Sequence, residues 1–233
     1  MAHTFGTNTA LAASSASPLR TNVTIENGET VAVLALKVVG ATDRTGGAPT
    51  LNGVPMTQAN STQKAAASPE CSAELWYVTN WKPGTYLLEL PNNSGASIYR
   101  QWLTGKAAPG MGSQFDSANG ANATGTNPSP GSVTPRTNGA ILFAIVATGA
   151  QTWAPSAQAG TSTNNSDDGA HGTGIQYYLQ STAGAFNLNW TFGTSDDYGA
   201  VVAAFVECPA VSLNNYNCCV KAGTNISVGE RVR

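Results

Sequence analysis

Charged side chains are scarce in this chain. Asp, Glu, Lys and Arg make up 10% of its 233 residues, against about 25% in an average globular protein. The 11 Lys and Arg residues are spread thinly and the net charge is −2. No basic cluster would neutralise a run of phosphates, so we do not expect nucleic-acid binding. Hydrophobic residues still make up 41%, which argues against a highly charged disordered chain.

Long apolar runs are also absent. The longest are "VAVLALKVVGA" (31–41) and "AILFAIVATGA" (140–150), and both fall short of the roughly 18 residues of a membrane span. The N-terminus lacks the basic segment and apolar run of a secretory signal. We therefore expect a protein that is made in a cytoplasm and has no membrane partner.

Histidine is nearly missing, since the chain has only His3 and His171. We expect His3 to lie on a frayed terminus. His171 follows Asp167 and Asp168 in "SDDGAHG", a grouping that can converge on a cation. A solvated Gly-rich loop is the stronger interpretation, because no spaced histidine pair supports a metal site.

A second acidic pair, Asp196 and Asp197 in "SDDYG", is a weaker calcium candidate and is more typical of a turn.

A nucleophile elbow, a phosphate-binding loop and a dinucleotide motif are all lacking. A carboxylate pair for glycoside hydrolysis would come from four glutamates: Glu70, Glu74, Glu89 and Glu207. Glu74 and Glu89 lie on strand-like runs whose outward positions accept charge, so we expect no enzyme, metal or cofactor.

Strand patterns fill the rest of the chain, and helical periodicity is scarce. The continuous run Thr30–Val39 predicts a strand buried on both faces. Asn52-Gly53 predicts a two-residue hairpin, and Pro83-Gly84 marks a turn between two further strands. Ten or so short strands without clear helices predict an all-β fold: an antiparallel β-sandwich, jelly-roll-like. We hypothesise that Thr30–Val39 pairs with Tyr198–Glu207 at its centre.

The chain divides into three parts on this interpretation. Residues 1–20, rich in Ala, Ser and Thr, are expected to form an extended N-terminal arm. Residues 21–207 form one sandwich domain with long polar loops. Residues 105–138 are rich in Gly, Pro, Ser, Asn and Thr, and we interpret them as a long excursion of this domain rather than a linker. Residues 208–233 form a Cys-containing C-terminal tail.

Aromatic and cysteine residues complete the candidates. The chain has five tryptophans: Trp76, Trp81, Trp102, Trp153 and Trp190. Trp81 lies at a turn and is the best candidate for stacking on a glycan, although core packing is the commoner role.

The four cysteines are Cys71, Cys208, Cys218 and Cys219. Their spacing fits neither a zinc site nor a CxxC redox motif, which leaves free thiols, an internal disulfide or links to neighbouring chains.

The order of the segments resembles bacteriophage structural proteins with a β-sandwich fold. In that group a buried strand precedes a hairpin such as "xNGxxMT", a "WYL…PxGT" strand pair follows, and the domain closes on "wgAvvvAF". The matching residues here are Asn52, Gly53, Met56 and Thr57, then Leu75, Trp76, Tyr77, Pro83, Gly84 and Thr85, and finally Ala200 to Phe205. The resemblance covers roughly residues 18–207 and leaves out the Cys218-Cys219 tail.

The resemblance implies a non-enzymatic virion component of the capsid, neck, collar or tail. Its expected partners are other virion proteins and symmetric copies of itself, and the N-terminal arm would order on a neighbour. Disulfides between copies would reinforce the assembly. We favour this role for Cys218 and Cys219, because we expect them to lie on an exposed tail. The alternative is a carbohydrate-binding, host-recognition module of a tail or head fibre that binds a surface glycan through Trp81.

Overall fold

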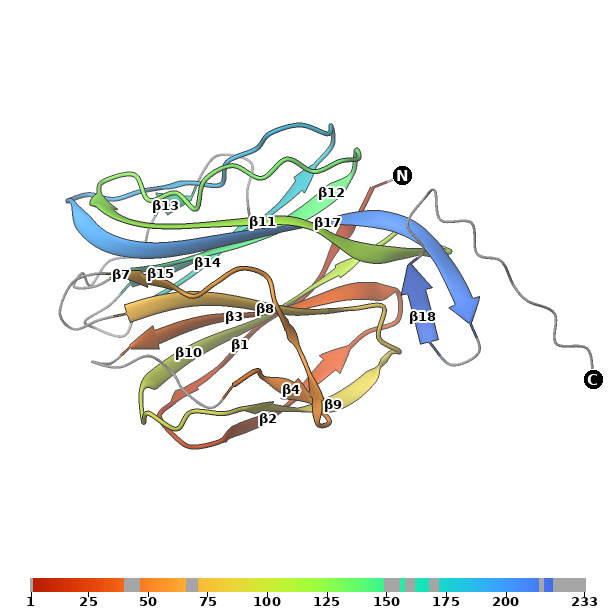
Figure 1. Cartoon of the computed structure of the whole chain (residues 1–233), viewed down its shortest axis with the longest axis horizontal. Coiled ribbons are helices and arrows are strands. Elements are labelled where there is room, and N and C mark those ends of the chain that lie inside the picture. Colours follow the sequence, from red (N-terminus) through yellow and green to blue (C-terminus); the bar gives the residue numbers. More distant parts are fainter. Residues whose placement is uncertain are drawn as a thin grey trace, which may run out of the picture.

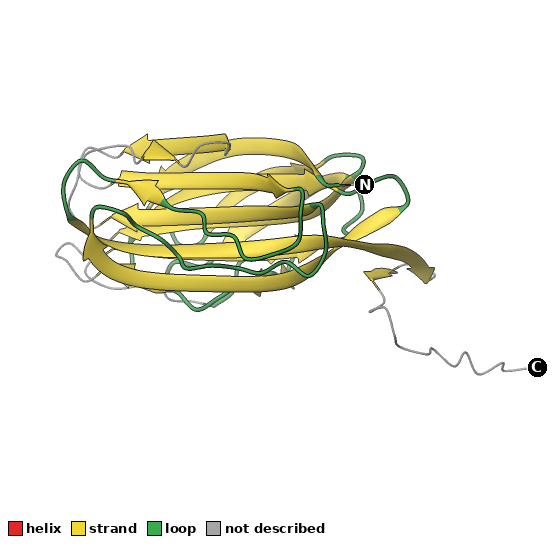
Figure 2. Ribbon diagram, turned by 90° about the horizontal axis from the view of Figure 1, so that it is seen from above, coloured by secondary structure: helices red, strands yellow, loops and turns green. Residues whose placement is uncertain are grey.

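The computed structural model describes residues 2–39, 47–65, 71–148, 156–157, 162–167, 172–213 and 216–219. It is all-β with antiparallel pairing, and the sheets pack face to face as a β-sandwich. Three sheets lie on one another as layers (Figure 1). Figure 2 shows the strands following the long axis of the molecule.

The middle layer is sheet A, with the order β1-β10-β3-β8-β6 and β7 also paired to β8. Its strands are β1 (Thr4–Ser14), β3 (Glu29–Val39), β6 (Thr57–Gln58), β7 (Gln63–Ala65), β8 (Cys71–Thr79) and β10 (Ser97–Lys106). The central strand β3 is the continuous apolar run of the sequence and is buried along nearly its whole length, as predicted.

Sheet B forms one outer layer, with the order β2-β9-β4-β5. Its strands are β2 (Leu19–Ile25), β4 (Thr50–Leu51), β5 (Val54–Pro55) and β9 (Gly84–Leu90). The hairpin predicted at Asn52-Gly53 is confirmed, because β4 pairs with β5 and the two turn residues have φ values of 45° and 80°. Two positive φ angles are the signature of a type I′ turn.

Sheet C forms the other layer, with the order β11-β17-β12-β15-β14 and β18 also paired to β17. Its strands are β11 (Met111–Gly125), β12 (Ala140–Thr148), β14 (Ser162–Asp167), β15 (Gly172–Gln180), β17 (Asp196–Leu213) and β18 (Tyr216–Cys219). A small separate pair consists of β13 (Ser156–Ala157) and β16 (Trp190–Thr191).

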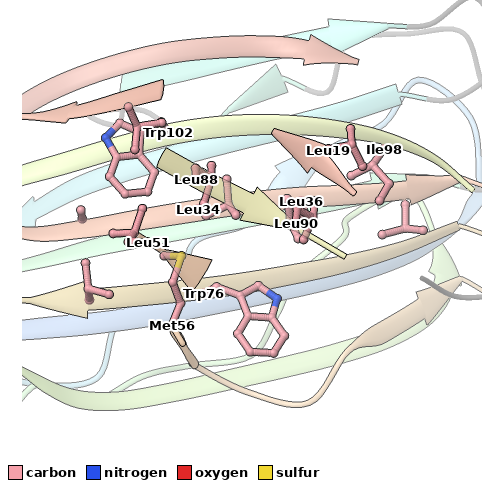
Figure 3. Close-up of a cluster of buried hydrophobic side chains, with 14 of the residues drawn as sticks. Leu19, Leu34, Leu36, Leu51, Met56, Trp76, Leu88, Leu90, Ile98 and Trp102 are labelled. Carbon is pink, nitrogen blue, oxygen red and sulfur yellow. The ribbon is translucent and has the colours of Figure 1, made fainter. Parts of the chain in front are cut away.

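Sheet A contributes to two hydrophobic cores, one on each face. Leu34 and Leu36 of β3 point into the core shared with sheet B, which also holds Trp76 and Trp102 (Figure 3). Their neighbours Val33 and Ala35 point into the core shared with sheet C. This alternation follows from the two-residue period of a strand. It explains why the sequence of β3 shows no polar face.

A third core lies on the outer face of sheet C. Leu142 and Val202 pack there against side chains from the connecting segments that cross this face, among them Leu188, Trp190 and Phe192. Both faces of β12 and of much of β17 are therefore buried, which accounts for their uninterrupted apolar sequences.

One expectation about strand pairing was wrong. The run Thr30–Val39 does not pair with Tyr198–Glu207, because β3 and β17 belong to different sheets and face one another across a core. The segment 105–138 contains the fifteen-residue strand β11, which pairs with β17 in sheet C. β17 continues to Leu213, beyond residue 207.

The N-terminal segment also differs from the arm expected over residues 1–20. Its first part forms β1, which pairs with β10 of the chain's own sheet A, and β2 begins at Leu19 in sheet B. The backbone of β10 supplies the ladder hydrogen bonds, so a segment with few large apolar side chains still forms a strand.

Candidate functional site

The strand β1 and the side chains that hold it are the candidate functional site. We call the place where β1 lies the groove, and its polar contacts are Glu29, Arg100 and Gln101. β1 is the last strand of sheet A on its side, and no described strand pairs with its outer edge. None of its eleven residues is fully buried. Only Phe5 and Leu11 pack as partly buried hydrophobic side chains against the cores. Polar contacts therefore carry much of its attachment.

The first contact is a buried carboxylate that binds the β1 backbone. Glu29 is only 3% exposed and accepts hydrogen bonds from the Thr7 amide (2.8 Å), the Thr7 hydroxyl (3.0 Å) and the Thr104 hydroxyl. A Cβ atom at Gly6 would collide with the side chains of Glu29 and Thr104. The close approach of β1 to this carboxylate thus requires a glycine.

Further along, buried polar side chains of β10 contact β1. Arg100 is 7% exposed, and its Nη2 donates to the carbonyl of Ala12 at 2.7 Å. Gln101 is 5% exposed and donates its amide to Asn8. β1 thus supplies the acceptor for Arg100 Nη2 and for the Gln101 amide, while Arg100 Nε and Nη1 are buried without a protein partner.

The start of the chain is fixed by His3. The ring is 1% exposed, with Nδ1 2.8 Å from the carbonyl of Gly139 and Nε2 2.9 Å from the hydroxyl of Ser113. A carbonyl only accepts, so Nδ1 carries the proton and Nε2 accepts from Ser113. The expectation of a frayed terminus at His3 was wrong, because these two hydrogen bonds hold it in the interior.

Ser113 is fixed in turn by a second set of contacts. Its hydroxyl lies 2.6 Å from that of Thr30, and its amide and carbonyl bind the side chain of Asn80 at 2.8 Å each. Asn80 has a φ of 58°, a conformation that asparagine tolerates better than most residues. Because Ser113 is 0% exposed, we interpret the His3–Ser113 pair as a latch for the N-terminus.

We predict that this latch weakens in acid. Burial lowers the pKa of His3, while the Gly139 carbonyl and the charge of Glu207 raise it to a smaller extent. The unfolded chain then takes up a proton at higher pH than the folded chain does. The stability from neutral His3 is fully present above the ordinary pKa of about 6.5 and falls as the pH is lowered through and below that value.

The measurement is chemical unfolding between pH 7.5 and 5. The wild type should lose unfolding free energy towards pH 5, and His3→Gln should flatten that part of the profile. Leu87→Ala, at an exposed and uncharged position of β9, is the control and should keep the wild-type slope. An unchanged slope in His3→Gln would contradict the latch.

The cysteines occupy two kinds of environment. Cys71 at the start of β8 is buried, and Cys208 in the second half of β17 is buried and disulfide-bonded. The backbone of β18 places Cys218 opposite Val211 and Cys219 opposite Ala210. The side chains of Cys218 and Cys219 lie outside the described part of the structure. Links between chains stay a prediction, which non-reducing electrophoresis of intact assemblies checks.

Trp81 lies at the edge of the core between sheets A and B. It is partly buried, packs against that core and meets the ring of Tyr86 edge to face, with centroids 5.1 Å apart. Tyr86 is itself held by a 2.6 Å hydrogen bond from its hydroxyl to the Lys82 carbonyl. Only part of the indole is thus free for a ligand, and glycan binding by Trp81 stays a prediction.

The remaining candidates are scattered or undescribed. His171, Asp168, Glu70 and Trp153 lie outside the described residues, as does the side chain of Asp167. Glu74, Glu89 and Glu207 lie in sheets A, B and C respectively, so the structure does not bring them together. Asp197 accepts a hydrogen bond from Thr124. Within the described ranges no three His, Cys, Asp or Glu side chains gather at one point, and no helix is long and apolar enough to cross a membrane.

Comparison of the chain with protein-family models, with curated proteins and with solved structures finds no match.

Proposed function

We propose that this chain is a non-enzymatic structural protein of a bacteriophage virion. It assembles in symmetric copies on the surface of the capsid, neck or tail and reinforces that surface. Its expected location is therefore the particle, after synthesis in the host cytoplasm.

The residues that carry the resemblance support this proposal through their places in the fold. Asn52 and Gly53 form the turn between β4 and β5. Trp76 lies in β8, and Gly84 begins β9. The closing segment Ala200–Phe205 is the fully buried part of β17. The shared pattern thus consists of framework residues, which is expected when a group of proteins shares a sandwich and varies its surface.

The observation that carries the proposal is the outer edge of β1. Thr4–Ser14 contains no Lys, Arg, Asp, Glu or Pro, the residues that commonly protect an edge strand from pairing with another chain. β1 is the end strand of sheet A, the middle layer, so its outer edge lies at the side of that sheet. The pairing of β1 with β10 shifts register between Phe5 and Asn8 and between Leu11 and Ser14, so Asn8–Leu11 is the regular stretch. An edge without charges or proline favours assembly with other chains by strand pairing.

The test is to look for the protein in purified particles by mass spectrometry and to measure its binding to particles that lack it. Thr9→Lys with Ala13→Lys places two charges on exposed positions of β1 and should weaken binding at least tenfold. Thr24→Lys with Thr85→Lys is the matched control on the exposed face of sheet B and should bind like the wild type. Absence from particles together with no binding would refute the proposal.

A further inference from the structure

The attachment of β1 leaves space on both of its faces. On the side of sheet C, a hollow of about 200 Å³ lies between Ala10 and Ala13 of β1 and a wall that includes Ile145 and Thr173. On the side of sheet B, a hollow of about 280 Å³ separates Thr7 and Thr9 from residues such as Asn22 and Trp102. β1 is therefore less closely packed than the strands whose side chains fill the cores.

The connection to the rest of the chain is short and exposed. Residues Ser15 to Pro18 are all exposed, and they lead from β1 in sheet A to β2 in sheet B. Two neighbouring asparagines contact this connection. The side-chain amide of Asn92 donates to the carbonyls of Ser15 and Ala16 at 3.3 and 3.4 Å, and the Ser17 hydroxyl donates to the side chain of Asn93 at 3.2 Å. A change of direction at these residues would redirect β1 while β2 keeps its place in sheet B.

The groove, in contrast, requires an occupant. Without β1, Glu29 would lose the amide and hydroxyl of Thr7, Arg100 the carbonyl of Ala12, and Gln101 the side chain of Asn8. The edge of β10 would also lose its ladder partner, and Phe5 and Leu11 would leave the cores against which they pack. The state in which β1 is released and the groove stays empty is therefore unfavourable.

The contacts also define what fits the groove. Glu29 binds the amide and hydroxyl of Thr7, Gln101 binds the side chain of Asn8, and a larger residue than Gly6 would collide with Glu29. The segment that meets all these conditions is β1, so a second copy of this chain supplies a suitable occupant with the same atoms in the same places.

We propose that β1 is exchanged between copies of this chain, so that the β1 of one copy pairs with the β10 of its neighbour. Every contact in the groove is kept, and only the path of residues 15–18 differs between the closed monomer and the exchanged assembly. This is domain swapping through a terminal strand. The proposal rests on the contacts of β1 and goes beyond the proposed role in a virion.

Crossed disulfides test the exchange on the purified full-length protein. Thr4 of β1 and Lys106 of β10 are register partners and lie at the border of the same surface hollow. One chain carries Thr4→Cys and a differently tagged chain carries Lys106→Cys, both with Cys218→Ser and Cys219→Ser to remove native links between chains, and the two are co-expressed and oxidised. Exchange predicts a reductant-sensitive band at twice the chain mass that contains both tags, absent when either variant is expressed alone.

A single chain with both substitutions shows that the bond can form at this position, through the loss of both added thiols at monomer mass. A second register pair, Ala10→Cys with Gln101→Cys, repeats the crossed design. Monomers alone in both crossed experiments would overturn the exchange. Because no particle is involved, that result leaves the virion proposal standing, and a crossed band in a protein absent from particles removes only the virion proposal.

Discussion

Phe205→Ala should lower the free energy of unfolding by about 3–5 kcal/mol, the usual cost of emptying a phenylalanine site in a core. Phe205 of β17 is 0% exposed and lies in the core between sheets A and C. Its ring meets those of Tyr77, Phe115 and Phe143 at centroid distances of 5.1, 5.9 and 6.0 Å. The cavity would lie where β8, β11, β12 and β17 meet, so surrounding side chains have little freedom to fill it.

The measurement is denaturant unfolding followed by tryptophan fluorescence. Leu87→Ala is the matched control, because Leu87 of β9 is 41% exposed and its loss should change stability by no more than about 0.5 kcal/mol. Similar midpoints for the two variants would show that Phe205 does not support the core as described.

Glu29→Ala should cost about 2–4 kcal/mol, since hydrogen bonds to buried charged groups contribute roughly 1.5–3 kcal/mol each and are not additive. The substitution leaves the Thr7 amide with the Thr104 hydroxyl as its remaining partner. It also removes the acceptor for the amide of Glu26, 2.7 Å from Glu29 in the wild type. β1 should loosen first, which amide hydrogen exchange detects as faster exchange over residues 4–14.

Glu89→Ala gives the comparison for Glu29. Glu89 pairs with Arg20 at 2.8 Å on the outer face of sheet B, where the two side chains are 34% and 61% exposed. Exposed ion pairs contribute about 0–1 kcal/mol, so this variant should stay close to the wild type. Equal losses in the two variants would mean that burial of Glu29 does not matter.

The strands with the strongest side-chain patterns were predictable. The apolar run of β3 and the Asn52-Gly53 hairpin follow from local chemistry alone: burial on two faces and a turn that needs positive φ. The all-β class followed from many such signals. The stacking of three sheets did not follow from the sequence. A strand that is buried on both faces has an apolar sequence whichever two layers enclose it.

β11 shows why weak patterns mislead. Its sequence, rich in Gly, Asn, Ala and Ser, is typical of a loop, yet it pairs with β17 from Met111 to Gly125. Backbone ladder bonds do not depend on side chains. The glycine at residue 120 lets the Gln63 side chain of β7 lie against β11, since a Cβ atom there would be 2.9 Å from Gln63 Cγ.

The site was predictable only in part. The segment of residues 1–20 was recognised as distinct, but its groove depends on contacts distant in sequence: Glu29 with Thr7, and His3 with Ser113 and Gly139. No local motif marks Glu29, which in the sequence reads as a polar residue after the turn "ENG". The structure alone shows that a polar residue at such a place is buried.

The position of sheet A has a consequence for how the molecule melts. Its side chains form one wall of the core against sheet B and one wall of the core against sheet C. Loss of order in β3 would expose both cores at once, so sheet B and sheet C would each lose the core that they share with sheet A. We therefore expect the three layers to unfold in a single cooperative transition, with the same midpoint whether the signal reports on sheet B or on sheet C.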